Sequence, residues 1–410
     1  MKTDILVIGG GSAGLSSALV ANSNNLKVTI VERETKLGGI LKQCIHNGFG
    51  LKYFKKEMTG PEYAQELINK VKNTNIEVLL ETSVLSVEKK IQGNFSVEVI
   101  SPKGKYKINC KAIILAMGCR ERPAAAISLC GTRPAGILTA GAAQKIINID
   151  GKMIGKRVVI VGSGDVGLIM ARRLHFEGAE VLGVYEISST PSGLNRNIVQ
   201  CLNDYNIPLH LSETVMSVVG EDRVEGVFVA KVNPDFSFDL STKKFIKCDT
   251  VLLSVGLVPE NDLVSNVVSL SAITNGAVVD DHYMTNCSGI FSCGNVLHVH
   301  DIVDDVTFEA ELAGKFANEY CKNKINEEKK YNCLARNGIR YVVPQKISGG
   351  DGFIPLKFRA NKAFRNCRVV VKSKETILMQ RPCNILLPAQ MEQIMIDKSK
   401  VNSDIIVEVE

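Results

Sequence analysis

The 12 cysteines of this 410-residue sequence include no C-x-x-C pair. Structural zinc sites, iron–sulfur clusters and thioredoxin-type redox motifs all use closely spaced cysteines, so the spacing argues against each of them. The N-terminus also lacks a signal-peptide layout, because the apolar run ILVIGG begins almost at once and continues into glycines. We therefore expect reduced thiols, a cytoplasmic location and no metal centre.

Long apolar runs and concentrated charge are missing too. The longest apolar run, AIILAMG, suits a buried strand and is much shorter than the roughly 20 residues of a membrane helix. The net charge is only +6, and the densest basic runs, KYFKK and NEEKK, are short. These absences argue against a membrane span and against nucleic-acid binding. The composition, 45% hydrophobic and 22% charged, is typical of a globular protein, and the length predicts two or three domains.

The N-terminal residues predict a strand, a glycine turn, a helix and a second strand. The apolar run DILVIG precedes Gly9, Gly11 and Gly14 in G-x-G-x-x-G spacing, and the second strand, KVTIV, ends at Glu32. In a dinucleotide-binding fold these glycines allow the tight turn, the approach of a pyrophosphate and close helix–strand packing. Glu32 stands 23 positions after Gly9, which is the spacing at which a carboxylate in this fold accepts a hydrogen bond from a ribose hydroxyl.

The same pattern occurs a second time. Gly162, Gly164 and Gly167 follow the apolar run RVVIV, and Glu186 lies 24 positions after Gly162. Each half continues through short alternating strands and closes on a matching apolar strand, within residues 110–118 and 248–256. The sequence therefore predicts an α/β fold with two Rossmann-like dinucleotide-binding domains and one dinucleotide site in each half.

This arrangement resembles the two-dinucleotide-binding-domain flavoproteins of the pyridine nucleotide–disulfide oxidoreductase superfamily over roughly residues 1–325. Their signature T-x-x-x-x-G-I-F-x-x-G-D corresponds to TNCSGIFSCGN, with Asn295 in place of the usual Asp. An asparagine can still bond a ribityl hydroxyl. The resemblance implies a discontinuous FAD-binding domain of residues 1–120 and 260–325 and an inserted NAD-binding domain of residues 121–259.

The resemblance also implies the residues that contact each cofactor. Those expected at FAD are Gly9, Gly11, Ser12, Ala13, Gly14, Glu32, Arg33, Gly38, Gly39, Val84, Ala116, Gly118, Gly294, Asn295, Val306 and Thr307. Those expected at NAD are Gly162, Ser163, Gly164, Asp165, Val166, Gly167, Glu186 and Gly256. Glu186 would repel a 2′-phosphate, and the ISST that follows has no Arg or Lys to bind one, so NAD(H) is favoured over NADP(H).

Cys44 and His46 are the catalytic candidates. In the disulfide reductases of this superfamily, two cysteines with four intervening residues follow the Gly-Gly pair and stack over the flavin. The corresponding positions here are Leu41 and His46, so Cys44 fits neither and has no cysteine nearby in the sequence. We expect no redox-active disulfide. His46 could stabilise charge on the reduced flavin or relay a proton, or it could only hydrogen-bond a loop.

Two further patterns surround the FAD signature. A helix is expected from about Thr307, and in this superfamily the positive end of that helix faces the flavin, with Val306 and Thr307 as the backbone contacts. His298, His300 and Asp301 form H-x-H-D, which could ligate a metal but is more often ordinary hydrogen bonding. After the polar stretch CKNKINEEKKYN, residues 326–410 contain short strand patterns and predict a small β-rich domain for docking to another subunit or to a second copy.

A closer resemblance concerns function. The segments GGILKQCIHNGFG, GTRPAGILTAGAAQ and CGNVLHVHDIVDD are similar to a bacterial subfamily of FAD/NAD-dependent oxidoreductases. Its members are associated with glycerol-3-phosphate dehydrogenase-like flavoproteins and a small cysteine-rich protein, and related chains are subunits of amine and opine dehydrogenases and of hydrogen cyanide synthase. The resemblance implies an electron-transfer subunit. The alternatives are a self-sufficient NADH oxidase or diaphorase, in which Cys44 could cycle through a sulfenic acid, and a scaffold with a structural FAD.

Overall fold

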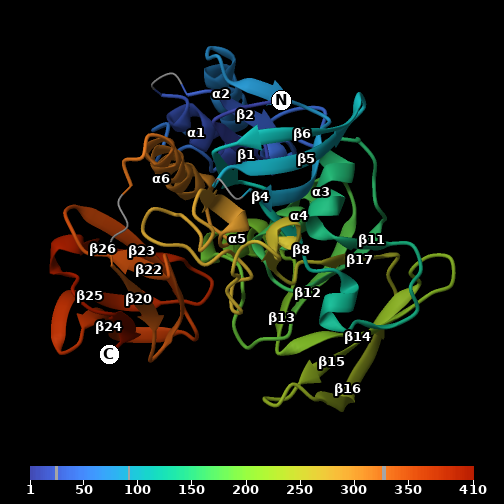
Figure 1. Cartoon of the computed structure of the whole chain (residues 1–410). Helices are drawn as coiled ribbons and strands as arrows, with labels where there is room; N and C mark the ends of the chain where they lie inside the picture. The colour runs from blue at the N-terminus through green and yellow to red at the C-terminus, as the bar shows by residue number, and fades with distance from the viewer. Residues whose placement is uncertain (24–25, 91–92, 326–328) are drawn as a thin grey trace. The chain divides into compact units, whose positions relative to one another are not determined.

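The computed structural model describes residues 1–23, 26–90, 93–325 and 329–410 (Figure 1). The chain forms two compact units, one of Met1–Cys119 with Val258–Glu410 and the other of Arg120–Leu257. It leaves the first unit through β8 (Cys119–Glu121) and returns through β18 (Leu257–Pro259). The predicted α/β class with two Rossmann-like sheets is confirmed.

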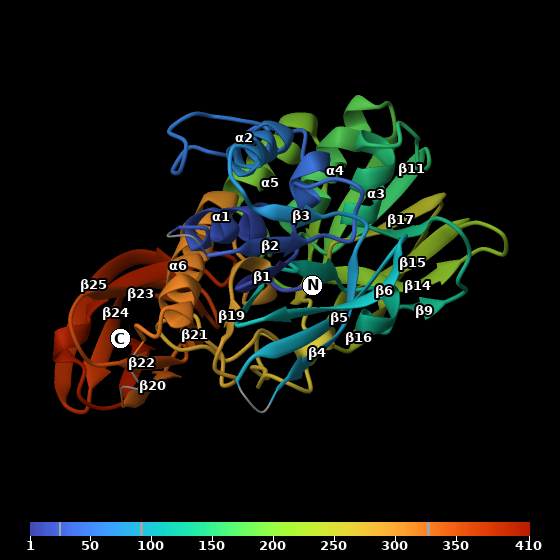
Figure 2. The same cartoon turned by 45° about the horizontal axis from the view of Figure 1, so that its top comes forward.

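A parallel five-stranded sheet forms the centre of the first unit. Its strand order is β19 (Ile290–Ser292), β7 (Ala112–Leu115), β1 (Ile5–Ile8), β2 (Val28–Val31) and β3 (Glu77–Leu79). Strands β1 and β7 are apolar at every position because both faces of the sheet are covered. Helices α1 (Ser12–Ala21) and α6 (Val303–Cys321) pack closely together (Figure 2). Gly314 permits this contact, since an added Cβ would lie 2.3 Å from the Ser17 carbonyl oxygen.

Two further elements complete this part of the unit. Helix α2 (Gly60–Lys72) begins at a capping box in which Thr59 and Glu62 bond each other's backbone N–H groups. An antiparallel meander follows it, made of β4 (Ser83–Lys89), β5 (Phe95–Ser101) and β6 (Gly104–Cys110). The meander leads the chain back into the parallel sheet at β7.

The second unit repeats this plan. Its parallel sheet has the order β10 (Ile137–Thr139), β17 (Thr250–Leu253), β11 (Arg157–Val161), β12 (Glu180–Glu186) and β13 (Leu209–Leu211). Its helices are α3 (Ala140–Asn148), α4 (Asp165–Phe176) and α5 (Asn195–Cys201). A smaller sheet contains β9 (Cys130–Gly131), β14 (Glu213–Val219), β15 (Gly226–Val232) and β16 (Phe238–Ile246).

The C-terminal residues form a β structure around their own hydrophobic cluster. One sheet contains β22 (Lys346–Ser348), β20 (Lys330–Ala335), β27 (Ile405–Val409), β24 (Phe364–Ser373) and β25 (Thr376–Leu386), in that order. The other contains β21 (Ile339–Val343), β23 (Phe353–Ala360) and β26 (Glu392–Asp397). The predicted β-rich C-terminal region is therefore confirmed. Part of the polar stretch before it, residues 326–328, lies outside the described residues.

One boundary differs from the prediction. Helix α6 begins at Val303, earlier than the expected start near Thr307. The residue before the helix, Ile302, offers no side-chain cap, so the usual sequence signal for a helix start is missing. Among the described residues, every helix is too short or too polar to pass through a lipid bilayer.

Candidate cofactor sites

The first glycine turn connects β1 to α1, and two of its glycines are required by the packing of the protein itself. Gly9 has a φ of 106°, and a Cβ there would lie 2.4 Å from the Ala116 carbonyl oxygen, just after β7. A Cβ on Gly14 would lie 1.8 Å from the Gly9 carbonyl oxygen. These glycines let the helix start and the end of β7 approach the turn closely.

Gly11 has a different environment. A Cβ at this position would meet only the Gly39 Cα, at 3.9 Å. The described protein atoms therefore leave room beside Gly11, at the start of α1, where unpaired helix N–H groups bind phosphate. Gly38 and Gly39, both at positive φ, border the turn, and the Gly38 N–H donates to the Gly10 carbonyl oxygen at 2.9 Å. The turn therefore forms a cradle that offers a pyrophosphate open space and the N–H groups of a helix start.

Glu32, at the end of β2, is held against this turn. Its Oε2 accepts the Gly10 N–H at 2.7 Å, and its Oε1 accepts the Glu34 N–H at 2.8 Å. The residue is 7% exposed. The carboxylate is thereby oriented by backbone donors, with lone pairs remaining for ribose hydroxyls. Arg33 beside it is exposed, with its Nε 3.8 Å from a Glu34 carboxylate oxygen.

The second glycine turn has the same construction. A Cβ on Gly162 would lie 2.4 Å from the Ser254 carbonyl oxygen, which follows β17 as Ala116 follows β7. Glu186 Oε2 accepts the Ser163 N–H at 2.9 Å and the Ser163 Oγ–H at 2.6 Å. Two βαβ units therefore each place a buried glutamate on the backbone of a glycine turn.

Ser254 is a residue that the sequence analysis missed. Its Oγ donates to the Gly164 carbonyl oxygen and accepts the Gly167 N–H, both at 3.0 Å. The hydroxyl therefore fixes the start of α4, the helix that follows the second glycine turn. Its only signal in the sequence is that it occupies the position matching Ala116 at the end of the closing strand.

The other residues predicted at NAD lie around this turn. Asp165 and Val166 are in the first turn of α4, and Asp165 Oδ1 accepts the Leu194 N–H at 2.8 Å. Gly256 follows β17 at a φ of 103°, and its carbonyl oxygen accepts the Arg122 N–H at 3.0 Å. Its counterpart after β7 is Gly118, also at positive φ and with no protein atom near an added Cβ among the described residues.

Three residues predicted at FAD converge from separate elements. Gly294, at the start of a 3-10 turn (Gly294–Val296), lies between α1 and α6. A Cβ on Gly294 would be 2.8 Å from the Ala13 Cβ and 3.2 Å from the Val306 Cγ1. The signature glycine therefore lies beside the first glycine turn. Val84 lies in β4, outside the parallel sheet, where it packs against the core.

The start of α6 is engaged by a loop. Asp304, 2% exposed, accepts the backbone N–H groups of Gly50, Lys52 and Tyr53 at 3.1, 3.0 and 2.7 Å. Thr307, one turn further on, shares a 2.7 Å hydrogen bond with the Tyr63 hydroxyl. The first turn of α6 thus anchors residues 50–53, so the loop that carries Cys44 and His46 ends against this helix.

Comparison with known proteins assigns the fold to a family. The sequence pattern described as pyridine nucleotide-disulphide oxidoreductase matches residues 3–314, which is most of the chain. The chain belongs to this family. Its members use FAD and NAD(P)H, and the two turns described above fit those cofactors: Gly11 leaves a cradle for a pyrophosphate, and each turn presents an oriented carboxylate.

The curated relatives include components of larger enzymes. Hydrogen cyanide synthase subunit HcnB of Pseudomonas protegens is 24% identical, with 73% of this chain and 65% of that protein aligned. An opine oxidase subunit of Agrobacterium tumefaciens is 28% identical, over 46% of this chain and 37% of that protein. This chain therefore spans less than two thirds of either relative. An NADH oxidase of Methanocaldococcus jannaschii is 25% identical over 90% of this chain and 82% of that protein.

Solved structures show the same fold. The thioredoxin reductase of T. acidophilum superposes with a TM-score of 0.63 at 22% identity, covering 78% of this chain and 98% of that one. The thioredoxin reductase of Lactococcus lactis gives a TM-score of 0.64 at 18% identity, over 78% and 99% of the two chains.

Cys44 lies just after a 3-10 turn (Gly39–Gln43) and is half-buried. Burial raises the pKa of its thiol to about 12. Its Sγ is 3.4 Å from the Ile40 carbonyl oxygen, and its own carbonyl oxygen accepts the Gly60 N–H at the start of α2. His46, two residues on, has its Nδ1 2.8 Å from the Asn47 carbonyl oxygen and its ring 5.0 Å from that of Phe49. A thiol with this pKa is almost entirely protonated at neutral pH.

We expect Cys44→Ser to leave NADH-to-dye turnover within about twofold of the wild-type rate, because a protonated thiol is a poor nucleophile. Steady-state assays at pH 7 with an artificial acceptor measure this. The control is Cys119→Ser, at a half-buried cysteine outside the loop. A loss of roughly tenfold or more in Cys44→Ser alone would assign the thiol to the reaction.

Four charged or ionisable side chains meet at the end of the FAD signature. Glu309 Oε2 lies 2.9 Å from His298 Nε2, 3.3 Å from His300 Nε2 and 2.7 Å from Lys357 Nζ. Its Oε1 accepts the Gly294 N–H at 2.8 Å. Sequence analysis identified the two histidines but missed Glu309 and Lys357. The Lys357 ammonium already supplies a cation to Glu309, so this arrangement is a buried ion pair with hydrogen-bonded histidines.

Burial and the contacts within this cluster lower the pKa values of two of its members, His298 and Glu309. Burial lowers the pKa of His298 to about 3. Burial alone would raise the pKa of Glu309, but Lys357 and the two histidines hold it well below its usual value. Asn295 also contacts this cluster, because its Oδ1 accepts the backbone N–H of His300 at 3.0 Å. The Asn295 Nδ2 would then be the atom that donates a hydrogen bond to a ribityl hydroxyl.

Stability should fall with acid because of this cluster. The unfolded chain protonates His298 below about pH 6.5, whereas the folded chain resists protonation until about pH 3, so stability is lost as the pH drops through this window. The depressed pKa of Glu309 acts in the same direction. His298→Gln should flatten the slope of unfolding free energy between pH 6.5 and 4.5, measured by urea denaturation. The exposed His175→Gln serves as control, and equal slopes in all three proteins would contradict this prediction.

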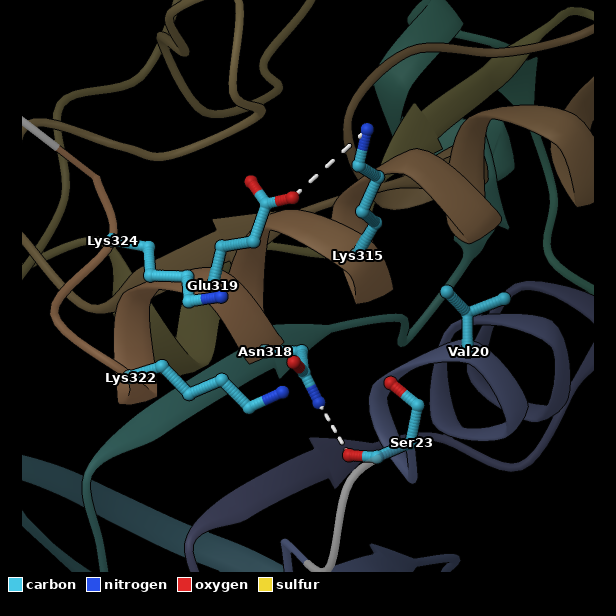
Figure 3. A pocket seen from close by; sticks show the side chains of 7 residues that line it. All are labelled: Val20, Ser23, Lys315, Asn318, Glu319, Lys322 and Lys324. Carbon is cyan, nitrogen blue, oxygen red and sulfur yellow. Dashed lines mark hydrogen bonds and ion pairs between the residues drawn. The ribbon is translucent and has the colours of Figure 1, made fainter.

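A separate surface pocket lies at the other end of α1 (Figure 3). Asn318 borders it and donates to the Ser23 carbonyl oxygen at 2.8 Å, while Lys315 Nζ is 4.0 Å from Glu319. It is lined by Val20, Ser23, Lys315, Asn318, Glu319, Lys322 and Lys324. The glycine turn stands at the opposite end of this 10-residue helix, so the pocket is not part of the FAD cradle.

Proposed function

We propose that this protein is an FAD-dependent, NAD(H)-linked oxidoreductase in which a hydride passes between the nicotinamide and N5 of the flavin. The observation that carries the proposal is the presence of two glycine turns. In each turn a backbone N–H donates a hydrogen bond to a buried glutamate, Glu32 in the first and Glu186 in the second. Residues 1–120 and 260–325 form the FAD-binding domain, residues 121–259 bind NAD, and residues 326–410 form an interface domain.

The residues of the chain act by binding and orienting the cofactors. The glycine turns admit the pyrophosphates, and Glu32 and Glu186 accept ribose hydroxyls through carboxylates already oriented by backbone donors. Flavin and nicotinamide supply the redox chemistry when they are bound. No redox-active disulfide takes part, since Cys44 is half-buried with a raised pKa and its position matches neither cysteine of the family's disulfide enzymes.

Glu186 sets the preference for NADH. Its carboxylate repels the 2′-phosphate of NADPH. The ISST segment that follows Glu186 has no Arg or Lys that could bind this phosphate. We expect the wild-type protein to favour NADH over NADPH in kcat/KM, and Glu186→Ser to reduce this preference by roughly tenfold or more, mainly through a higher KM for NADH. Glu177→Ser, on the exposed end of α4, is the matched control. A wild-type preference for NADPH would overturn the assignment.

The proposal extends to a partner. We infer that the chain is the electron-transfer component of a complex with a glycerol-3-phosphate dehydrogenase-like flavoprotein, with a small cysteine-rich protein as a further component. Two observations support it: the segments shared with that subfamily, and relatives that are named as subunits of hydrogen cyanide synthase and opine oxidase. An amine or opine dehydrogenase complex is the nearest alternative, because it uses the same kind of subunit.

A second candidate is a self-sufficient NADH oxidase or diaphorase. The NADH oxidase relative supports it, because that similarity extends over nearly the whole of this chain. The two candidates differ in the acceptor. An oxidase delivers electrons to oxygen without another protein, whereas an electron-transfer subunit waits for its partner.

Anaerobic titration with NADH, followed by oxygen, tests both. We expect NADH to bleach the flavin absorbance of the purified holoprotein and oxygen to restore it slowly. Fast reoxidation would favour the oxidase, and a flavin that NADH does not bleach would overturn the NAD-linked function. With the partner flavoprotein added, glycerol 3-phosphate should bleach this flavin, and it should not do so without the partner.

A further inference from the structure

We propose that Cys367 and Cys383 form a reversible intramolecular disulfide, a modification site on the C-terminal β domain. The two residues are directly opposite each other on the antiparallel strands β24 and β25. They are 16 positions apart in the sequence, so no motif spacing marks them as a pair. The pairing of the strands brings the thiols together.

The backbone hydrogen bonds define the geometry of this pair. Arg368 exchanges both of its backbone hydrogen bonds with Glu410, at 2.7 and 2.8 Å, beyond the end of β27. Since neighbouring residues of a strand point their N–H and C=O groups to opposite sides, the backbone of Cys367 faces β25. Pro382, on β25, stands opposite Arg368. Because the backbone of Arg368 bonds Glu410 and not β25, the missing N–H of Pro382 costs no hydrogen bond between these strands.

Cys367 and Cys383 are therefore a hydrogen-bonded cross-strand pair, with Cα atoms about 5.5 Å apart. Disulfides have Cα separations of about 4.4–6.8 Å, and paired residues project their side chains from the same face. The Cα separation therefore lies within the disulfide range. Closing the bond needs side-chain rotation and a small local adjustment of the backbone that brings the two Cβ atoms to about 3.5–4.5 Å.

The surroundings give the two thiols different roles. Both are half-buried and pack against the core of the C-terminal domain. Burial, together with the nearby Cys383, raises the pKa of Cys367. Arg381 lies two residues before Cys383 on the same face of β25, and its charge interacts with that thiol. The Arg381 guanidinium also forms an ion pair with Glu392. Because this cation lies beside Cys383, we assign Cys383 as the attacking thiol.

The oxidant is a hydroperoxide, and the chemistry proceeds in two steps. The Cys383 thiolate attacks one oxygen of hydrogen peroxide, the O–O bond breaks, and a sulfenic acid forms while the released hydroxide takes up a proton as water. The Cys367 sulfur then attacks the sulfenic sulfur, the S–S bond forms, and the hydroxyl leaves with the thiol proton as a second water. Two thiols and one peroxide give one disulfide and two waters, and a small thiol reverses the oxidation.

Cys333 provides an internal comparison. It lies in the same domain on β20, is 7% exposed, and burial raises its pKa. It has no cysteine opposite it in the described strands, since its register partner is Ile405. We expect it to remain reduced under conditions that oxidise the pair.

The test uses the full-length holoprotein treated with a small excess of hydrogen peroxide, alkylated, and digested for mass spectrometry. We expect a linked peptide joining Cys367 and Cys383, two fewer alkylatable thiols, and full recovery with dithiothreitol. Cys367→Ser should leave a sulfenic acid at Cys383 that dimedone traps, and Cys383→Ser should abolish the linked peptide. Cys130→Ser, at an exposed cysteine on β9, should behave like the wild type.

Two results would overturn the proposal: separate alkylation of both thiols after peroxide treatment, or a linked peptide joining either cysteine to a different one. The wild-type peptide map decides the question even where a serine variant fails to fold.

Discussion

Replacing Lys357 with methionine is expected to lower the free energy of unfolding by about 3–5 kcal/mol, because it leaves a buried carboxylate without its cation. The Glu309 side chain is 0% exposed and the Lys357 side chain 5% exposed, with 2.7 Å between Nζ and Oε2. Water cannot replace the lost partner at such a site. Because Glu309 also accepts the Gly294 N–H, the same change should weaken FAD binding.

Urea denaturation of the FAD-free protein measures this loss. Lys362→Met, at an exposed lysine of the same domain, is the matched control and should shift stability by less than about 0.5 kcal/mol. The double variant Lys357→Met with Glu309→Gln should recover part of the loss, because it removes both charges. If Lys357→Met and Lys362→Met unfold alike, the ion pair does not contribute to the stability of the fold.

Gly11→Ala is expected to weaken FAD binding by roughly 10- to 100-fold while the FAD-free protein stays folded. The nearest protein atom to the added Cβ is 3.9 Å away, so the protein alone tolerates it, and the backbone φ of −78° suits alanine. The methyl group would occupy the space beside the helix start where the pyrophosphate binds. FAD titration of the apoprotein gives the affinity, and thermal unfolding of the apoprotein gives the stability.

Gly14→Ala is the contrasting variant. Its Cβ would lie 1.8 Å from the Gly9 carbonyl oxygen, so the backbone itself must move and the FAD-free protein should be destabilised as well. The pair separates a glycine needed for the ligand from a glycine needed for packing. Unchanged FAD affinity in Gly11→Ala would place the pyrophosphate elsewhere and remove the main support for the FAD cradle.

The parts of the site predicted from sequence are local. Gly9, Gly14 and Glu32 belong to one βαβ unit of about 30 residues, in which the turn, the helix start and the strand end are neighbours in the chain. Their spacing therefore determines their geometry, and the structure places Glu32 on the backbone of the turn as that spacing implies. The second turn was predictable for the same reason.

The start of α6 illustrates a weaker local signal. A capping side chain marks a helix start in the sequence, and Thr59 provides such a mark at α2. Ile302 offers none, and Asp304 in the first turn instead binds the backbone of a loop some 250 positions earlier. The boundary was placed too late because the contacts that stabilise it are distant in the sequence.

By itself, the sequence determined the fold class, the two glycine turns and the residues that border them, because short-range spacing governs all of these. Only the tertiary structure decided that Lys357 reaches Glu309, that Ser254 holds the start of α4, and that Cys367 faces Cys383. The first two pairs depend on how a helix packs against a strand or the end of a strand, and the third depends on the register of two paired strands. Packing between a helix and a distant strand has no local spacing that encodes it, and the register of the β24–β25 pair follows from the turn at residues 374–375, which joins the two strands.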